Sequence, residues 1–234
     1  PEDTTTTPTL WKIYADSLTI SRSDLTLRLA DDSTNIYTRM GDLKVREVVA
    51  DLGKPAYSVG SIDWNDGALR YNDIDMPQLS LHTGPLRMEN DSIKAPHLQL
   101  KTADSDLIVG LDMPLSLTDS LNPGNMQLTM DAQLARNDLM PFLSSLPRPM
   151  QERWPPYPLS VKGQIKGNLE YMEFTDLDVS LPTALATKAS GFVANMTDTK
   201  RLRADVDFEA QTQNLSFVMA ALPRDVQRNY RIPN

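Results

Sequence analysis

The sequence contains no cysteine and only two histidines among its 234 residues. Without cysteine there is no disulfide, no zinc site with thiolate ligands and no cysteine nucleophile. No run approaches the 18 or so apolar residues of a membrane-spanning helix, and no signal peptide is visible at the start. The 23 basic residues are outnumbered by 31 acidic ones and are scattered singly, which disfavours nucleic acid as a partner.

The abundant feature of the chain is the recurrence of apolar residues at every second position, as in LWKIYADSLTISRSDLTLRL. Such runs are separated by short polar segments like NDG, TGP and NPGN. A period of two is typical of a strand with one buried face, and these segments are typical of tight turns. About 17 short strands without crossover helices predict an antiparallel meander.

A mainly β fold follows from this pattern. An open sheet of so many strands usually curls, splits or closes, and helices could cover it in only two places. We therefore expect a long antiparallel meander of short strands, curled into a taco-like trough or folded into a sandwich, with two small helical inserts.

Two segments break the strand pattern and resemble each other. They are DLMPFLSSLPRPMQERWPPYP and NLSFVMAALPRDVQRNYRIPN, offset by 76 positions. Asp138 and Asn214 open them as N-cap residue types. Chance similarity between two amphipathic segments is the alternative, but a repeat predicts that Leu139 matches Leu215 and that Trp154 matches Tyr230. The expected organisation is a linker at 1–9, a first β unit at 10–158 ending in the insert 138–158, and a second β unit at 159–234 ending in the insert 214–230.

Residues that could carry catalytic chemistry are sparse. His82 and His97 lie beside leucines on separate expected strands, so alternation directs both toward solvent. Carboxylates two apart, as at Asp176 and Asp178, share one face of a strand and could in principle bind a cation, but a polar outer face explains them as well. No nucleophile elbow, zincin motif or phosphate loop occurs. We expect no catalytic residue, no metal site and no cofactor, and we do not expect an enzyme.

The apolar stripe is the most informative chemistry in the sequence. Taken alone, it is the ordinary core of a closed β protein. The functional interpretation is an apolar groove that stays open to acyl chains, because burying a 16-carbon chain at about 0.8 kcal/mol per methylene offers on the order of 13 kcal/mol. A register error of one residue would turn the residues of a whole strand outward. Alternation predicts the following lining residues: Trp64, Tyr71, Leu79, Leu81, Leu98, Leu100, Leu107, Val109, Leu111, Leu128, Met130, Ile165, Phe174, Val179, Leu181, Val206 and Phe208.

Several stretches resemble the TamB-like proteins of the Bacteroidetes, which are part of the AsmA-like group. These stretches are LTISRSDLTLRL, IDWNDGALRYND, LSLHTGPLRMENDSIKAPHLQLKTADSDLIVGLDMPLSL and IKGNLEYMEFTDLDVSL. The first helical segment, set between QLARNDL and LSVKGQIKGNL, is similar to the small helical element that these proteins insert before a strand pair. Together the stretches cover most of residues 10–210.

The resemblance implies an internal segment of a periplasmic protein, anchored in the inner membrane by an N-terminal helix outside this sequence. Its β repeats would form a half-open trough that binds phospholipid or another lipid, for lipid transport between membranes or for outer-membrane assembly. An outer-membrane β-barrel protein would be the partner of regions outside this sequence. The alternative, from a different class, is a closed cell-surface β module that binds carbohydrate or protein. Closure of the core distinguishes the two.

Overall fold

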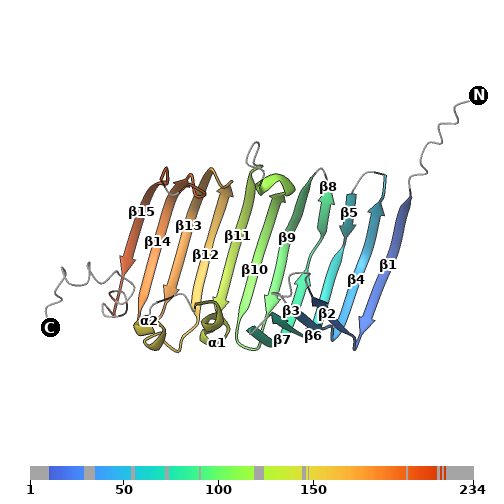
Figure 1. The fold of residues 1–234 in the computed structure, drawn as a ribbon, viewed down its shortest axis with the longest axis horizontal. Coiled ribbons are helices and arrows are strands. Elements are labelled where there is room, and N and C mark those ends of the chain that lie inside the picture. Colours follow the sequence, from blue (N-terminus) through green and yellow to red (C-terminus); the bar gives the residue numbers. More distant parts are fainter. Residues whose placement is uncertain are drawn as a thin grey trace, which may run out of the picture.

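The structure of the chain is a computed structural model. Fifteen strands form one antiparallel sheet, and short helical segments lie at its margins (Figure 1). This confirms the expected mainly β fold with small helical inserts. The described residues are 11–28, 35–53, 56–71, 74–89, 91–118, 124–143, 146, 148–198, 200–214, 217 and 219.

The elements follow one another along the chain as a nearly uninterrupted series of strands. The strands are β1 (Lys12–Ser21), β2 (Asp24–Arg28), β3 (Asn35–Arg39), β4 (Asp42–Asp51), β5 (Ala56–Val59), β6 (Ser61–Tyr71), β7 (Ile74–Thr83), β8 (Leu86–Glu89), β9 (Ser92–Lys101), β10 (Asp106–Pro114), β11 (Met126–Leu134), β12 (Leu159–Gly167), β13 (Tyr171–Leu181), β14 (Leu185–Ala194) and β15 (Arg203–Gln211). The helices are the 3-10 segments η1 (Leu115–Thr118) and η2 (Met140–Leu143) and the α-helices α1 (Arg136–Leu139) and α2 (Arg148–Glu152).

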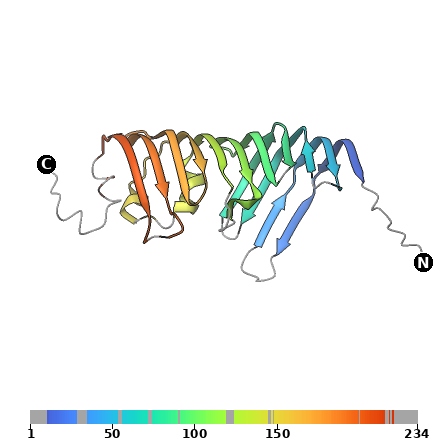
Figure 2. The ribbon, with the colours of Figure 1, turned by 90° about the horizontal axis from the view of Figure 1, so that it is seen from above.

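From β9 to β15 each strand pairs with its neighbour in sequence, as a meander requires. Toward the N-terminus the strands are bent, and each bent strand appears as two consecutive elements. Gly41 separates β3 from β4 with a φ of 52°, and a Cβ there would lie 2.3 Å from the carbonyl oxygen of Asn65. Only glycine fits this position without strain. Beyond the bends, β3 pairs with the outer half of β6, β2 pairs with β3, and these strands form a flap that projects from the sheet (Figure 2).

Two segments that were expected to be tight turns lie within or between bent strands instead. Residues 65–67, NDG, belong to β6, and the pairing with β7 shifts there by a bulge between Trp64 and Gly67. Residues 83–85, TGP, comprise the end of β7 and the two residues before β8, but both strands run antiparallel to β9, so the chain does not reverse. Glycine and aspartate serve bulges as well as turns, and this ambiguity made the expectation wrong.

The register separates the sheet into two chemically different faces. Residues directly opposite each other in an antiparallel pair point to the same side, so a row can be followed from strand to strand. One such row consists almost entirely of apolar residues, and we call the side of the sheet that carries it the apolar face and the other side the polar face. The first row crosses eleven strands: Ile20, Leu43, Trp64, Leu81, Leu100, Leu107, Ala132, Val161, Val179, Thr187 and Ala210. The neighbouring row on the polar face is Thr19, Lys44, Asp63, His82, Gln99, Ile108, Asp131, Lys162, Asp178, Lys188 and Glu209.

A small core forms where the first helical insert packs on one end of the strands. Its buried members are Trp154, Leu181, Ala184 and Phe217. The rings of Trp154 and Phe217 meet edge to face, with centroids 5.8 Å apart. Figure 2 shows the helices and the β2–β3 flap on the same side of the sheet. The insert therefore covers one end of the apolar face.

Of the two predicted N-cap residues, one is correct and one is wrong. Asn214 caps as expected, since its Oδ1 accepts a hydrogen bond of 3.1 Å from the amide of Phe217. Asp138 does not, because α1 begins at Arg136, after a residue that has no side-chain cap. Leu215 and Tyr230 lie outside the described residues, so the matching of Leu139 with Leu215 and of Trp154 with Tyr230, and with it the division into two units, stays a prediction.

The side chain of Asp138 fastens the insert to the sheet. Its Oδ2 accepts hydrogen bonds of 2.5 Å from the hydroxyls of Thr102 and Ser105, which lie in the turn between β9 and β10. The Ser105 hydroxyl in turn accepts a hydrogen bond of 2.8 Å from the amide of Ala135. The sequence distance of more than 30 residues between the partners explains why a local cap was expected instead.

Candidate functional site

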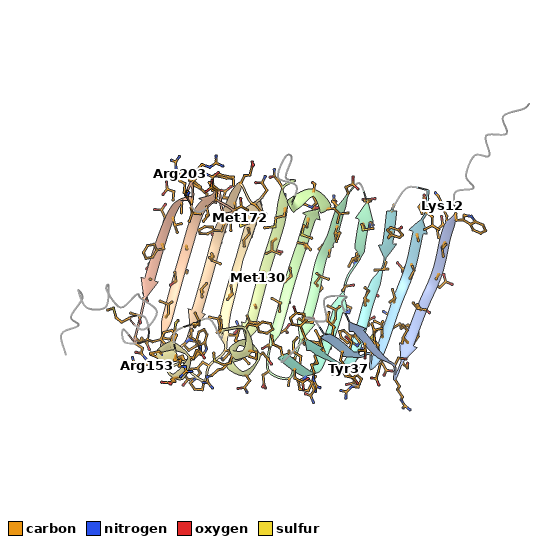
Figure 3. The ribbon with its side chains drawn as sticks, in the orientation of Figure 1. Lys12, Tyr37, Met130, Arg153, Met172 and Arg203 are labelled. Atoms are coloured by element: carbon orange, nitrogen blue, oxygen red, sulfur yellow. The ribbon has the colours of Figure 1, made fainter. Side chains whose placement is uncertain are left out.

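The candidate site is the apolar face itself. The register places all of the predicted lining residues on this face, because their cross-strand partners connect them through rows of the same side. Leu100 lies opposite Leu107, for example, and Val109 lies opposite Met130. Figure 3 shows Met130 near the middle of the sheet, so the face extends well away from the strand ends.

Bulges keep the apolar residues on one side where simple alternation fails. Phe174 and Val179 of β13 are separated by an odd number of positions, yet the pairing with β12 places both on the apolar face. The extra residue is accommodated near Asp176, whose φ is 50°, opposite Gly163. A Cβ on Gly163 would lie 3.0 Å from the Cα of Leu177. A bulge of this kind adds one residue to one strand and restores the facing pattern beyond it.

Most of the predicted lining residues are half-buried. Leu79 and Leu181 are buried, with 4% and 3% of their surface exposed. Tyr71, Val206 and Phe208 are exposed, and the other lining residues are intermediate. A closed core would bury such side chains almost completely. In the described part of the chain, the neighbours in the sheet cover the flanks of these residues, but little covers their tips.

The margins of the face are the least covered. Phe208, on the last strand of the sheet, is 70% exposed, and Val206 beside it is 38% exposed. Tyr71 lies at the end of β6, where the flap of β2 and β3 pairs, and is 42% exposed. These three residues share the apolar face but contribute to its edges instead of its middle.

The polar face is a ladder of ion pairs that suits contact with water. Lys162 lies 3.1 Å from Asp131 on the neighbouring strand, and Lys101 lies 3.2 Å from Asp106. From Asp131 to Glu209, acidic and basic residues alternate along the row on this face, so each of these carboxylates has a basic neighbour on the next strand. Exposed pairs of this kind contribute little stability individually, about 0–1 kcal/mol each. Their main effect is that the two faces of the sheet are not interchangeable.

Shallow hollows also lie on the polar face, along the line of bulges. One of about 540 Å³ lies beside Arg87, Lys94 and Asp112. Another of about 430 Å³ is lined by residues that include Asp176 and Asp178, the carboxylate pair singled out from the sequence. Both hollows are open to solvent.

Among the described residues, two exposed side chains have shifted acidities: Tyr37 in the flap and Asp198 between β14 and β15. A hydrogen bond of 3.0 Å donated by the Tyr37 hydroxyl to Asp24 raises the pKa of Tyr37 above 10.0. The Arg201 guanidinium donates a hydrogen bond of 2.8 Å to Asp198, which lowers the pKa of that carboxyl below 3.8. Neither shift creates an acid or a base that would act near neutral pH.

Within the described residues, no three histidine, aspartate or glutamate side chains are arranged to hold a metal ion. The same part of the chain has no helix with the length and apolar character needed to cross a membrane.

Compared with known proteins, the chain matches no family model, no curated sequence and no solved structure. The resemblance to TamB-like proteins therefore rests on the strand pattern and the quoted stretches.

Proposed function

We propose that the chain is an internal segment of a TamB-like periplasmic bridge and binds the acyl chains of phospholipid or another lipid along its apolar face. The observation that carries the proposal is the apolar row, most of whose members are half-buried and which crosses eleven strands from Ile20 to Ala210. At about 4.8 Å per strand, this row is roughly 50 Å long. Its long axis runs across the strands, in the direction in which a lipid would move along a bridge.

An apolar face of this extent is costly to leave in water. Burial of apolar surface contributes about 25 cal/mol per Å², and contiguous exposed apolar patches on proteins commonly mark binding surfaces. An acyl chain is a suitable ligand for such a surface, because it covers apolar side chains without requiring a polar partner. The row contains one hydroxyl residue, Thr187, and is otherwise apolar. A uniform lining offers similar free energy at successive positions, which suits movement along the sheet.

The two long edges of the face differ, and this difference gives the bound lipid a direction. The first insert covers one end of the strands, with Trp154 and Leu181 at its core. Figure 3 shows Lys12 and Arg203 toward the other end of the strands, away from Arg153 of the insert. In the proposed complex the acyl chains lie on the apolar face and the head group lies toward the uncovered strand ends.

A pair of substitutions on neighbouring residues of β11 tests the proposal. Leu128→Glu places a carboxylate on the apolar face between Leu111 and Ile165, whereas Gln127→Glu places the same group on the polar face. Titration with a fluorescent fatty acid should show saturable binding to the parent chain and to Gln127→Glu, and at least tenfold weaker binding to Leu128→Glu. Equal binding by the two variants, with folding verified by circular dichroism, would contradict the proposal.

The periplasmic location, an inner-membrane anchor and an outer-membrane β-barrel partner belong to the same proposal and are supported by the resemblance alone. The closed cell-surface module requires a filled core. The half-buried lining residues of the described sheet support an open face better than a filled one.

A further inference from the structure

The two histidines of the chain meet on the polar face, although they come from different strands. His82 lies on β7 opposite Asp63 and Gln99. The carbonyl of His97 on β9 accepts a hydrogen bond of 3.0 Å from the amide of Gly84, so His97 is the diagonal neighbour of His82. The centroids of the two imidazole rings are 6.2 Å apart, in an edge-to-face arrangement. Alternation correctly directed both residues outward, but it did not bring them together.

A carboxylate holds one of these rings in place. Oδ1 of Asp63 lies 2.5 Å from Nδ1 of His82, while its Oδ2 lies 2.8 Å from the guanidinium of Arg46. When the neutral ring carries its proton on Nδ1, it donates that proton to this carboxylate and keeps its lone pair on Nε2. A histidine whose second nitrogen donates to a carboxylate is the usual arrangement in zinc sites, because the carboxylate fixes the tautomer and makes the ring more basic.

We propose that His82 and His97 form a binding site for a divalent transition-metal ion such as Zn²⁺, with Asp63 as the orienting group and water completing the coordination. With Zn–N bonds of about 2.0–2.1 Å, the two ring centroids are about 5 Å apart at a tetrahedral angle at the metal and about 6.5 Å apart at a linear one. The observed 6.2 Å lies near the wide-angle end of this range, so the two rings must approach each other by about 1 Å to reach a tetrahedral angle.

The surroundings are compatible with a cation. The side chain of His82 is 53% exposed and His97 is exposed, so both are accessible from solvent. The guanidinium of Arg46, which lies 2.8 Å from Asp63, has its charge offset by that carboxylate. The strand scaffold fixes the spacing of the two residues through the pairing of β7 with β9. The site lies on the side of the sheet opposite the lipid-binding surface, so it does not depend on the proposed function.

The test is titration of the chain, prepared without a polyhistidine tag, with ZnCl₂ near pH 7.5 by calorimetry. Because the chain has only two histidines, the imidazole proton resonances can be followed by NMR in the same titration. We expect saturable binding of one ion and a shift of both imidazole signals. Binding should weaken sharply when the pH falls below 6, since protons then compete for the ring nitrogens.

Four variants separate this site from adventitious binding. His82→Gln and His97→Gln should each weaken Zn²⁺ binding by about tenfold or more, and Asp63→Asn should weaken it by about 10–100-fold through loss of the orienting carboxylate. Asp131→Asn is the matched control, because it removes a carboxylate from the same row far from the histidines. The absence of saturable binding to the parent, or parent-like binding by either histidine variant, would overturn the proposal. Equal effects of Asp63→Asn and Asp131→Asn on Zn²⁺ binding would show that Asp63 does not orient His82 for the metal.

Discussion

Replacement of Leu181 by alanine tests whether the helical insert packs on the sheet. Leu181 is 3% exposed and belongs to the core of Trp154, Ala184 and Phe217. Leucine-to-alanine substitutions at such sites cost roughly 2–5 kcal/mol, depending on how far the surroundings collapse into the space. The core lies at the end of the strands under short helices that can settle, so we expect about 3 kcal/mol. For a chain of this size, the melting temperature should fall by roughly 6–12 °C.

The control for this prediction is Leu202→Ala, at a position that is 53% exposed. An exposed leucine makes few contacts, and its truncation should change stability by no more than about 0.5 kcal/mol. The measurement is paired urea and thermal unfolding, followed by circular dichroism. If Leu181→Ala unfolds at the same midpoint as Leu202→Ala, the insert does not pack on the sheet in solution. The statement that the insert covers one end of the apolar face would then be wrong.

Three further substitutions address the insert, the turns and the titrating groups. Asp138→Ala should destabilise the chain by about 2–3 kcal/mol in urea unfolding, because two turn hydroxyls lose a charged acceptor. Gly167→Ala should destabilise it by at least about 1 kcal/mol, since φ is 117° and the added Cβ would lie 2.1 Å from the Tyr171 carbonyl oxygen. The pKa of Asp198 should be found below 3.8 by NMR titration and should rise in Arg201→Ala. Because the pKa is lowered in the folded chain, the Asp198 contribution is present above pH 3.8 and is lost as the pH falls through the folded value; an unchanged pKa in the variant would contradict this.

The apolar face could be predicted from the sequence because strand alternation is a local property. Leu107, Val109 and Leu111 specify one side of β10 without any knowledge of its neighbours. The predicted residues stayed on one face across bulges because the apolar spacing itself changes there, as between Phe174 and Val179. The position of the bulge is therefore visible in the sequence, where the spacing of the apolar residues changes from even to odd.

The features that escaped prediction depend on contacts between distant segments. The ring of Trp64 lies over Gly67, so NDG forms a bulge in β6 where a turn was expected. The partners of Asp138 lie more than 30 residues earlier in the chain. The meeting of His82 with His97 depends on the register between β7 and β9. A single sequence contains no signal for such a register, because many alignments of two alternating strands satisfy the same pattern.

The central claim is that the apolar face is open and binds acyl chains. Native mass spectrometry of the chain, expressed in a bacterial envelope and purified without detergent, tests it most directly. The account predicts adducts with masses of phospholipid or another acyl lipid, confirmed by extraction, that are depleted in Leu128→Glu and retained in Gln127→Glu. A chain that is free of lipid and monomeric in the same measurement, and that acquires no lipid from added vesicles, would contradict the account.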